Sequence, residues 1–319
     1  MAALSDSLFV VTLVAHLIAV VAFAAAHTMH RAAASRRPAP VSAEKAASAV
    51  ATLVAPPAAP PRLVTAHRAR ACGVAAVAVA AFAQTGCLIT RALAAGRVPW
   101  GNMYEFIVAV TLVGVIAWLA LAVRRPAVRA LGLYVAVCSV ILLGAAGLHL
   151  YTPAGPLVPA LQSAWLAVHV SAAAIASGLF LLGFLAAVAL LLRVRFDRRG
   201  AGRPMDLRDN LAARLPAERA LRRLSFRLHA VGFLLWTFAV MAGAVWAEAS
   251  WGRYWGWDPK ETWAFISWVV YAGYLHAQAT ASVRSTTGAW IAVIGWATMM
   301  FNLFAVNLVI SGLHSYAGT

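Results

Sequence analysis

The chain has 319 residues, of which 63% are hydrophobic and 11% are charged, and its mean hydropathy is +0.80. A soluble domain is about 45–50% apolar and about 25% charged, so this composition excludes a soluble globular protein, a disordered chain and a collagen-like chain. The net charge of +16 and the pI near 11.2 would favour nucleic-acid binding if the basic residues shared one surface, so their positions decide their meaning.

Eight runs of residues are long and apolar enough to be membrane helices, which need about 20 mainly apolar residues. They are 8–27, 71–93, 103–123, 130–149, 164–192, 229–247, 260–281 and 290–310. Basic residues follow the first run instead of preceding it, which is opposite to a cleavable signal peptide, so we treat it as a true span. The expected fold is an all-α polytopic membrane protein with about eight transmembrane helices and no convincing internal repeat.

The 26 basic residues are divided unequally between alternate loops. Twenty-two lie in 28–70, 124–129 and 193–227 and at Arg284, whereas Arg91, Arg97, Arg253 and Lys260 lie on the other side. By the positive-inside rule the side with 22 is cytoplasmic, and both termini are then extracytoplasmic. The charge therefore indicates topology and attraction to the anionic headgroups of the lipid bilayer, and no nucleic-acid partner is expected.

Two cytoplasmic loops have distinct compositions. Residues 38–61 hold six of the 14 prolines and many alanines, which is typical of a flexible connector. Residues 206–228 are basic and amphipathic, which predicts an interfacial helix, with a docking surface for a cytoplasmic partner as the alternative.

The three cysteines, Cys72, Cys87 and Cys138, lie in or near spans and form no C-x-x-C pair, so we expect apolar packing and not thiol–disulfide catalysis. The sequence contains no G-x-x-x-x-G-K-[ST], H-E-x-x-H or G-x-S-x-G. ATP hydrolysis, zinc proteolysis and serine hydrolysis therefore lack their usual sequence support.

The most informative segment is 246–268, which holds six of the 12 tryptophans. Trp251, Trp255 and Trp257 lie in a glycine-interrupted loop between the sixth and seventh spans. An aromatic belt at the membrane interface explains one or two tryptophans at a helix end, but it does not explain three in such a loop. Because aromatic faces stack on planar π systems, the loop predicts a platform for a large flat ligand.

The sequence D-P-K-E that follows this loop is a helix-start signal. Asp258 is expected to be the N-cap, with Pro259 at the first helical position and Glu261 closing a capping box, so both carboxylates are interpreted as structural before catalytic. Arg253 and Lys260 are the basic residues of this loop. They are candidate partners for carboxylates on a ligand, with interface snorkelling as an equal alternative.

The nine histidines fall into groups by their predicted depth. His27, His30, His67 and His229 lie toward the cytoplasmic side, where positive flanks explain them, His16 is expected to make a helix-packing hydrogen bond, and His149 has no assigned role.

His169 and His314 are predicted at the same membrane face as the tryptophan loop. Two neutral imidazoles on opposite sides of a planar metal macrocycle would give bis-axial coordination. His276 lies in the seventh span, about 25 Å below Pro259, where a histidine is a candidate ligand within the membrane. For each of these three histidines alone, a packing role is an equal alternative.

The stretch WGRYWGWDPKETWAF resembles the tryptophan-rich "WWD" signature of haem-handling proteins in cytochrome c biogenesis. YLH at 274–276, LHSY at 313–316 and VPWGNMYEF at 98–106 resemble the CcsA (ResC) branch. The resemblance implies a haem-handling membrane domain over 71–319 with its WWD loop at about 246–263, preceded over 1–70 by the first helix and the Ala/Pro-rich loop.

The resemblance also implies a function. CcsA-type proteins pair with a ResB/CcsB-type membrane subunit as the system II cytochrome c synthase, a haem lyase. The synthase moves haem b from the cytoplasmic side to the outer face and joins it there to the C-x-x-C-H motif of apocytochrome c. The expected location is the bacterial cytoplasmic membrane, and thioredoxin-like thiol reductants are further expected partners.

The site residues implied by the resemblance follow its motifs. His169 and His314 correspond to external axial haem ligands and His276 to an internal membrane ligand, whose counterpart belongs to the ResB-type partner. The residues expected to contact haem are Trp251, Arg253, Tyr254, Trp255, Trp257, Asp258, Lys260 and Trp263.

No residue is required as a general acid or base, since the expected contribution is positioning; Glu105 and Glu248 are the weak candidates. Two alternatives stay open. One is a haem exporter or delivery subunit without ligation activity, as in the CcmC branch. The other is an unrelated polytopic transporter, which broken spans would favour.

Overall fold

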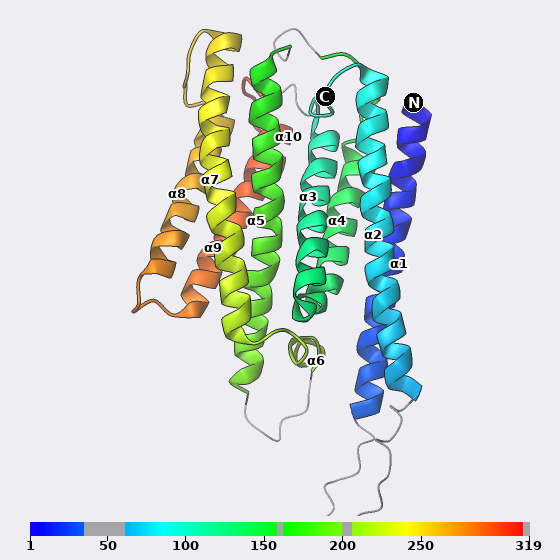
Figure 1. The fold of residues 1–319 in the computed structure, drawn as a ribbon. Helices are drawn as coiled ribbons and strands as arrows, with labels where there is room; N and C mark the ends of the chain where they lie inside the picture. The colour runs from blue at the N-terminus through cyan, green and yellow to red at the C-terminus, as the bar shows by residue number, and fades with distance from the viewer. Residues whose placement is uncertain (35–60, 158–161, 200–205, 315–319) are drawn as a thin grey trace, which may run out of the picture.

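The fold comes from a computed structural model that describes residues 1–34, 61–157, 162–199 and 206–314. These residues are mostly helical and contain no strand, which confirms the predicted all-α membrane fold (Figure 1). The helices are α1 (Ala2–Ala34), α2 (Pro61–Ala95), α3 (Met103–Arg124), α4 (Gly132–His149), α5 (Ala164–Asp197), α6 (Leu207–Ala212), α7 (Glu218–Trp251), α8 (Pro259–Ala279), α9 (Ser285–Met300) and α10 (Val306–Leu308). The predicted Ala/Pro-rich connector, the side chain of His30 and the last two residues of LHSY lie outside the described residues.

Seven segments of these helices are long and apolar enough to cross a membrane. They are Ala2–Met29, Val64–Ala95, Met103–Arg124, Pro126–His149, Ala164–Asp197, Glu218–Trp251 and Ser285–Leu308. The other predicted span, 260–281, is α8, which is not among these seven: its 21 residues are long enough for a hydrocarbon core of about 30 Å but include several charged, polar and aromatic side chains. It lies beside α7 and α9 and, with 21 residues against the 34 of α7, covers only part of the height of the bundle (Figure 1).

The bundle consists of two four-helix repeats that were not evident in the sequence. The first repeat is α1–α2–α3–α4, with 33, 35, 22 and 18 residues, and the second is α5–α7–α8–α9, with 34, 34, 21 and 16. In each repeat a long antiparallel pair packs together, a loop leads to a shorter helix, and the fourth helix packs against the first and the third. Short α6 lies in the connection between α5 and α7, inside the second repeat.

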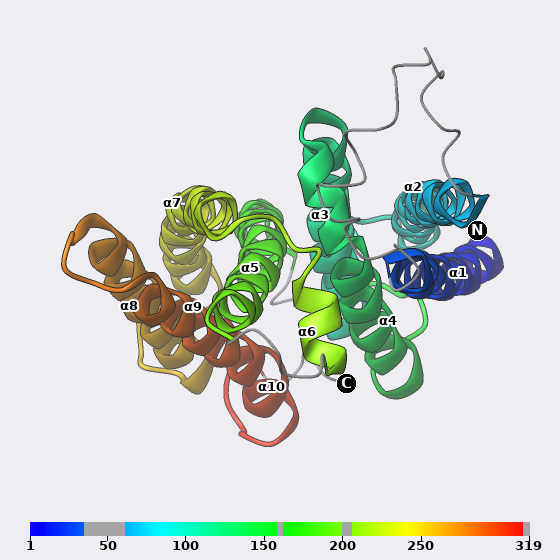
Figure 2. The same ribbon diagram turned by 90° about the horizontal axis from the view of Figure 1, so that it is seen from below.

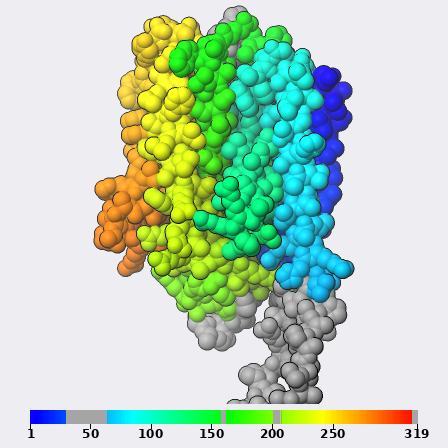
Figure 3. All heavy atoms as spheres, viewed as in Figure 1, coloured from blue at the N-terminus to red at the C-terminus, as the bar shows by residue number. Residues whose placement is uncertain are grey.

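The helix pairs of the two repeats stand in a row, in the order α2/α1, α3/α4, α7/α5 and α8/α9 (Figure 2). The equivalent long helices α2 and α7 are exposed on the same face of the molecule (Figure 3). The repeats meet where α3 crosses α5. A Cβ added at Gly178 would lie 2.5 Å from the Cβ of Val113, so glycine allows this close approach.

Among the described residues, the loops at the two ends of the bundle separate the basic residues as predicted. The upper end in Figure 1 holds the loops 96–102 and 252–258, and the lower end holds α6 and the turn at 280–284. The four minority basic residues belong to the upper end. The predicted interfacial helix over 206–228 is instead α6 followed by the start of α7, because Pro216 lacks the N–H that a continuous helix would need.

Candidate functional site

The tryptophan loop is fixed at both of its ends. Gly252 has φ 70° and ends α7 in the left-handed conformation that glycine adopts without strain. The predicted capping box starts α8: Asp258 accepts a hydrogen bond from the backbone N–H of Lys260, and Glu261 accepts one from that of Asp258. Glu261 also binds the N–H of Gly256 at 2.8 Å and the guanidinium of Arg253 at 3.2 Å.

Asp258 also ties the end of the described chain to this loop. Its Oδ1 accepts the N–H of Leu313 at 2.7 Å, and its Oδ2 lies 2.9 Å from Nδ1 of His314. Burial raises the pKa of Asp258, but the hydrogen bonds from His314 and Leu313 outweigh burial and lower the pKa to about 2. A carboxylate that accepts a hydrogen bond from Nδ1–H leaves the lone pair on Nε2. Metal-binding imidazoles are commonly oriented by such a hydrogen-bond partner.

His169 reaches the same region from α5. Its Nδ1 lies 2.7 Å from the carbonyl oxygen of Ala239, so Nδ1 carries the proton and Nε2 the lone pair. Gly243 makes room for the ring, since a Cβ there would lie 2.7 Å from it. The imidazole stacks on Trp246 with centroids 6.0 Å apart, and the ring of His314 lies 5.7 Å from the same indole.

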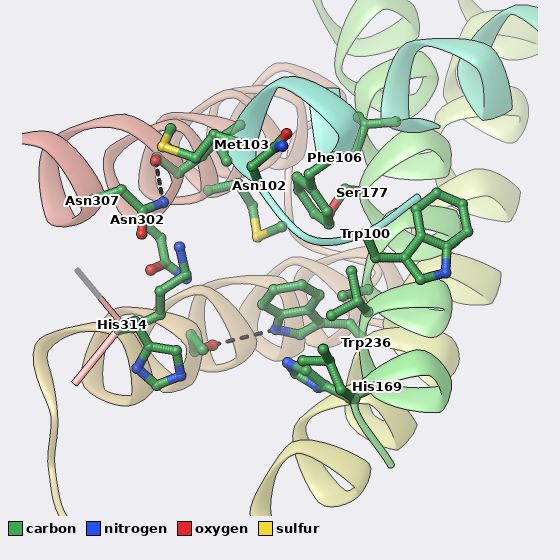
Figure 4. Close-up of a pocket in the computed structure, with 18 of the residues that line it drawn as sticks. Trp100, Asn102, Met103, Phe106, His169, Ser177, Trp236, Asn302, Asn307 and His314 are labelled. Atoms are coloured by element: carbon green, nitrogen blue, oxygen red, sulfur yellow. Dashed lines mark hydrogen bonds between the residues drawn. The ribbon is translucent and has the colours of Figure 1, made fainter. Parts of the chain in front are cut away.

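Two adjoining cavities, of about 160 and 60 Å³, open between these side chains. They share the lining residues His169, Trp236, Trp246, Lys260, Ala264 and His314. The larger cavity extends toward α3 and the end of α9, where Trp100, Asn102, Met103, Asn302 and Asn307 line it (Figure 4). The smaller one extends toward the tryptophan loop. Two imidazoles therefore share a mainly apolar, indole-walled cavity.

Comparison with known proteins places this architecture. Residues 100–314 match the family described as Cytochrome C assembly protein. The chain belongs to the cytochrome c assembly protein family.

Individual relatives narrow the branch within that family. The chain is 33% identical to the cytochrome c biogenesis protein CcsA of Lobularia maritima over 274 residues, covering 74% of this chain and 83% of the relative. It is 33% identical to CcsA of Synechococcus elongatus over 289 residues, covering 77% and 87%. It is 35% identical to CcsA of Chlamydomonas reinhardtii over 234 residues, covering 72% and 64%. The predicted CcsA resemblance is confirmed, and the chain is a multi-pass membrane protein of cytochrome c biogenesis.

In this cytochrome c assembly protein, the predicted site residues divide by position. Trp251, Tyr254, Trp255 and Lys260 line the cavities together with His169 and His314. Asp258 lines neither cavity and orients His314 through the hydrogen bond to its Nδ1. Arg253 is engaged with Glu261 and does not line either cavity.

Trp257 and Trp263 also lie outside the cavity walls. Trp257 is 66% exposed and has φ 56°, a left-handed backbone that a bulky residue adopts only under strain. Trp263 packs on Phe301 with ring centroids 4.0 Å apart.

His276 lies apart from the cavities, exposed near the end of α8. Its assignment as an internal haem ligand stays a prediction for a separate site. His149 and Glu248 are also exposed and line neither cavity. Glu105 is completely buried between Arg91 and Arg97, so its carboxylate is an ion-pair partner in this structure.

Two histidines are completely buried without lining either cavity. His16 bonds through Nδ1 to the carbonyl of Thr12 one turn earlier, so the expected packing hydrogen bond is made within its own helix. His229 was attributed to the positive flanks of its span, but it lies in the core against Phe180 and Tyr274.

Several cavity residues were missed from the sequence. Trp236 and Trp246 line both cavities, and the π-helical turn Phe301–Ala305 carries Asn302 into the larger one. Oδ1 of Asn302 and of Asn307 are buried without a hydrogen-bond partner in the described part of the chain. π-Helical turns occur frequently at functional sites, but no residue pattern in this segment predicts one.

Proposed function

We propose that this chain is the haem-presenting subunit of a cytochrome c synthase. The observation that carries the proposal is the meeting of His169 and His314, 145 positions apart in the sequence, around the single indole of Trp246. Haem is the substrate, and the two imidazoles are its axial ligands.

The donor set supports haem over a bare metal ion. The described residues contain no group of three or more His, Cys, Asp or Glu that could hold a metal ion alone. Two imidazoles need a macrocycle to supply the other four iron ligands, and indole walls suit its flat faces. Both imidazoles have Nδ1 on an oxygen acceptor, which orients each ring and leaves the lone pair on Nε2.

Charge supports an assignment for the carboxylate end of haem. Lys260 lines both cavities, whereas Arg253 is engaged with Glu261. Lys260 is therefore the basic residue that binds a propionate, and Arg253 is a support of the tryptophan loop. Burial lowers the pKa of the Lys260 amine to about 7, and a propionate beside it would favour the charged form. Trp251, Tyr254 and Trp255 line the smaller cavity and contact the macrocycle there.

The reaction needs positioning more than acid–base chemistry. Each cysteine thiol of the C-x-x-C-H motif adds across one vinyl group, with sulfur bonding to the carbon next to the ring and hydrogen going to the terminal carbon. The addition requires no oxidant and releases no leaving group. The chain's residues hold haem so that its vinyl groups meet the thiols, which is catalysis by proximity and orientation.

The remaining assignments complete the proposal. The cavities face the extracytoplasmic side of a bacterial plasma membrane, as the positive-inside rule requires. His276, exposed on α8, is an internal ligand that a ResB/CcsB-type subunit completes. Apocytochrome c is the acceptor substrate.

The experiment is co-expression with a ResB-type subunit and an apocytochrome c. The wild-type complex should carry haem with a bis-histidine spectrum and yield thioether-linked cytochrome. His169→Ala and His314→Ala should each lose that spectrum and the product, whereas His149→Ala, an exposed histidine outside the cavities, should keep both. A complex that carries haem but never yields thioether product would show a delivery subunit instead. An unchanged spectrum in both cavity variants would contradict the proposal.

A further inference from the structure

Residues 97–105 are the loop before α3 and the first turn of α3 in the first repeat, yet they reach the cavity of the second. Trp100, Gly101, Asn102 and Met103 all line the larger cavity (Figure 4). We propose that this segment is a second haem-binding arm, which the first repeat contributes as the second repeat contributes the tryptophan loop. Trp100 is the residue of this arm that contacts the ligand. The inference rests on the proposed function and assigns a further contact to the same substrate.

The segment is built by the same hydrogen-bond scheme as the tryptophan loop. Arg97 pairs with Glu105 at 2.8 Å, as Arg253 pairs with Glu261 at 3.2 Å, and each pair is eight residues apart. A backbone N–H of each loop also binds its glutamate, from positions that differ by one residue: Gly101, four residues before Glu105, donates at 2.7 Å, and Gly256, five residues before Glu261, donates at 2.8 Å.

The helix start that follows each segment is equivalent as well. Asn102 caps α3 as Asp258 caps α8, and Glu105 and Glu261 each occupy the third helical position. The two repeats thus place two arms of the same construction on one cavity.

The arm formed by residues 97–105 is held more firmly than a capped helix start requires. Glu105 also pairs with Arg91 at 2.7 Å, and both side chains are at most 1% exposed. Arg91 donates to the carbonyl of Thr152, and Arg97 donates to that of Gly155 at 2.9 Å. Buried ion pairs of this kind are costly to form unless fully hydrogen-bonded, so they mark a segment whose position matters.

Trp100 is the residue of this arm that its local structure does not explain. The cap needs Asn102 and Glu105, and the turn needs the N–H of Gly101, but neither uses the indole. Its Nε1 is buried and has no hydrogen-bond partner among the described residues. An indole at a cavity wall offers a flat apolar face to a ligand, which fits a macrocycle.

The experiment measures haem release from the full chain purified with its partner subunit, by transfer to an excess of apomyoglobin. Trp100→Ala should release haem about tenfold faster than wild type, since an aromatic contact of this kind contributes roughly one factor of ten. The matched control is Trp290→Ala, which removes an indole that is 58% exposed on α9 and lines neither cavity. It should release haem at the wild-type rate.

Two outcomes separate this inference from the proposed function. If wild type holds haem, and Trp100→Ala releases it no faster than Trp290→Ala does, the second arm is wrong and the two-histidine site stands. If wild type holds no haem, both proposals fail. Should Trp100→Ala not be recovered as folded protein, Trp100→Phe decides: release two- to fivefold faster than wild type supports the arm, and an unchanged rate overturns it.

Discussion

The two repeats use one helical scaffold for opposite purposes. In the first repeat, Tyr104 follows the cap Asn102 and is 1% exposed, with its ring packed between Phe9 at 5.1 Å and Tyr151 at 5.4 Å. The guanidinium of Arg91 lies 4.8 Å from the same ring. Aromatic rings therefore fill the upper end of this repeat.

In the second repeat Lys260 takes the place of Tyr104, since each is the second residue after its cap, and the same end is a cavity. Its helices have nearly the lengths of their counterparts, so the difference lies in side-chain volume and not in backbone. The comparison shows that a cavity can open in one of two similar helical units when core rings are left out, while the filled unit supplies rigidity and one wall.

The largest effect is expected when an aromatic ring is removed from the first repeat, whose upper end is filled by rings. Tyr104→Ala should destabilise the protein by about 3–5 kcal/mol, because it leaves an aromatic-sized hole in a packed region. Lys260→Ala, at the equivalent position of the open repeat, should cost less than about 1 kcal/mol, since it borders space that is already open. Unfolding midpoints in detergent measure both. Equal losses would show that the two ends are packed alike.

The second effect compares the glutamates of the two arms. Glu105→Gln should cost about 3 kcal/mol, because it leaves Arg91 charged and buried without its partner. Glu261→Gln should cost about 1 kcal/mol, since Arg253 has a side chain that is 32% exposed and can be hydrated. The same unfolding assay applies. A greater loss for Glu261→Gln would reverse the assignment of the rigid copy.

The third prediction concerns a larger side chain placed in the cavity. Ala173→Leu should lower haem occupancy about tenfold without lowering the unfolding midpoint, because Ala173 lines the larger cavity and the added carbons occupy it. Absorbance per protein measures occupancy. Val168→Leu, a 40% exposed position on the same helix and outside the cavities, is the control and should bind haem normally. Full occupancy in Ala173→Leu would place haem elsewhere.

The smallest effect concerns the caps. The folded pKa of Asp258 is about 2, below the value near 3.9 of an unfolded aspartate, so the unfolded chain binds the proton first as pH falls. The stability that this group contributes is complete above about pH 4 and is lost between about pH 4 and pH 2. Asn102, the cap of the first repeat, has no such proton to bind.

Asp258→Asn gives the second repeat the cap of the first and should remove this pH dependence. The difference in unfolding midpoint between wild type and Asp258→Asn should therefore shrink as pH falls from 5 to 3. Parallel curves for the two proteins would mean that the carboxylate is not held as described.

The sequence predicted the helices well but not their ends. The first two spans were expected at 8–27 and 71–93, whereas α1 and α2 cover Ala2–Ala34 and Pro61–Ala95. Hydropathy marks the part of a helix that lies in hydrocarbon, and it gives no signal where the helix continues into polar surroundings. The capping box at Asp258 was predictable because its hydrogen bonds are local.

The cavity was only half predictable, for the same reason. His169, His314 and the tryptophan loop were found from a motif and from topology. Trp100 and Ser177 line the cavity because α3 crosses α5 closely at Gly178. Asn302 lines it because of a π-helical turn. Neither the close crossing nor the π-helical turn was predictable from a sequence pattern. The repeat was missed because it is conserved in helix lengths and in the Arg–Glu spacing, while few side chains coincide.

The unequal helix lengths within each repeat have a consequence for the surrounding lipid. At 1.5 Å per residue, α1, α2, α5 and α7 are about 50 Å long, whereas α3 and α8 are about 32 Å, close to the hydrocarbon thickness of a bilayer. The long pairs can meet a thicker or thinner membrane by exposing less or more of their ends. The short helices α3 and α8 cannot, and both carry cavity walls. We therefore expect acyl-chain length to set how far the two cavities lie below the headgroups.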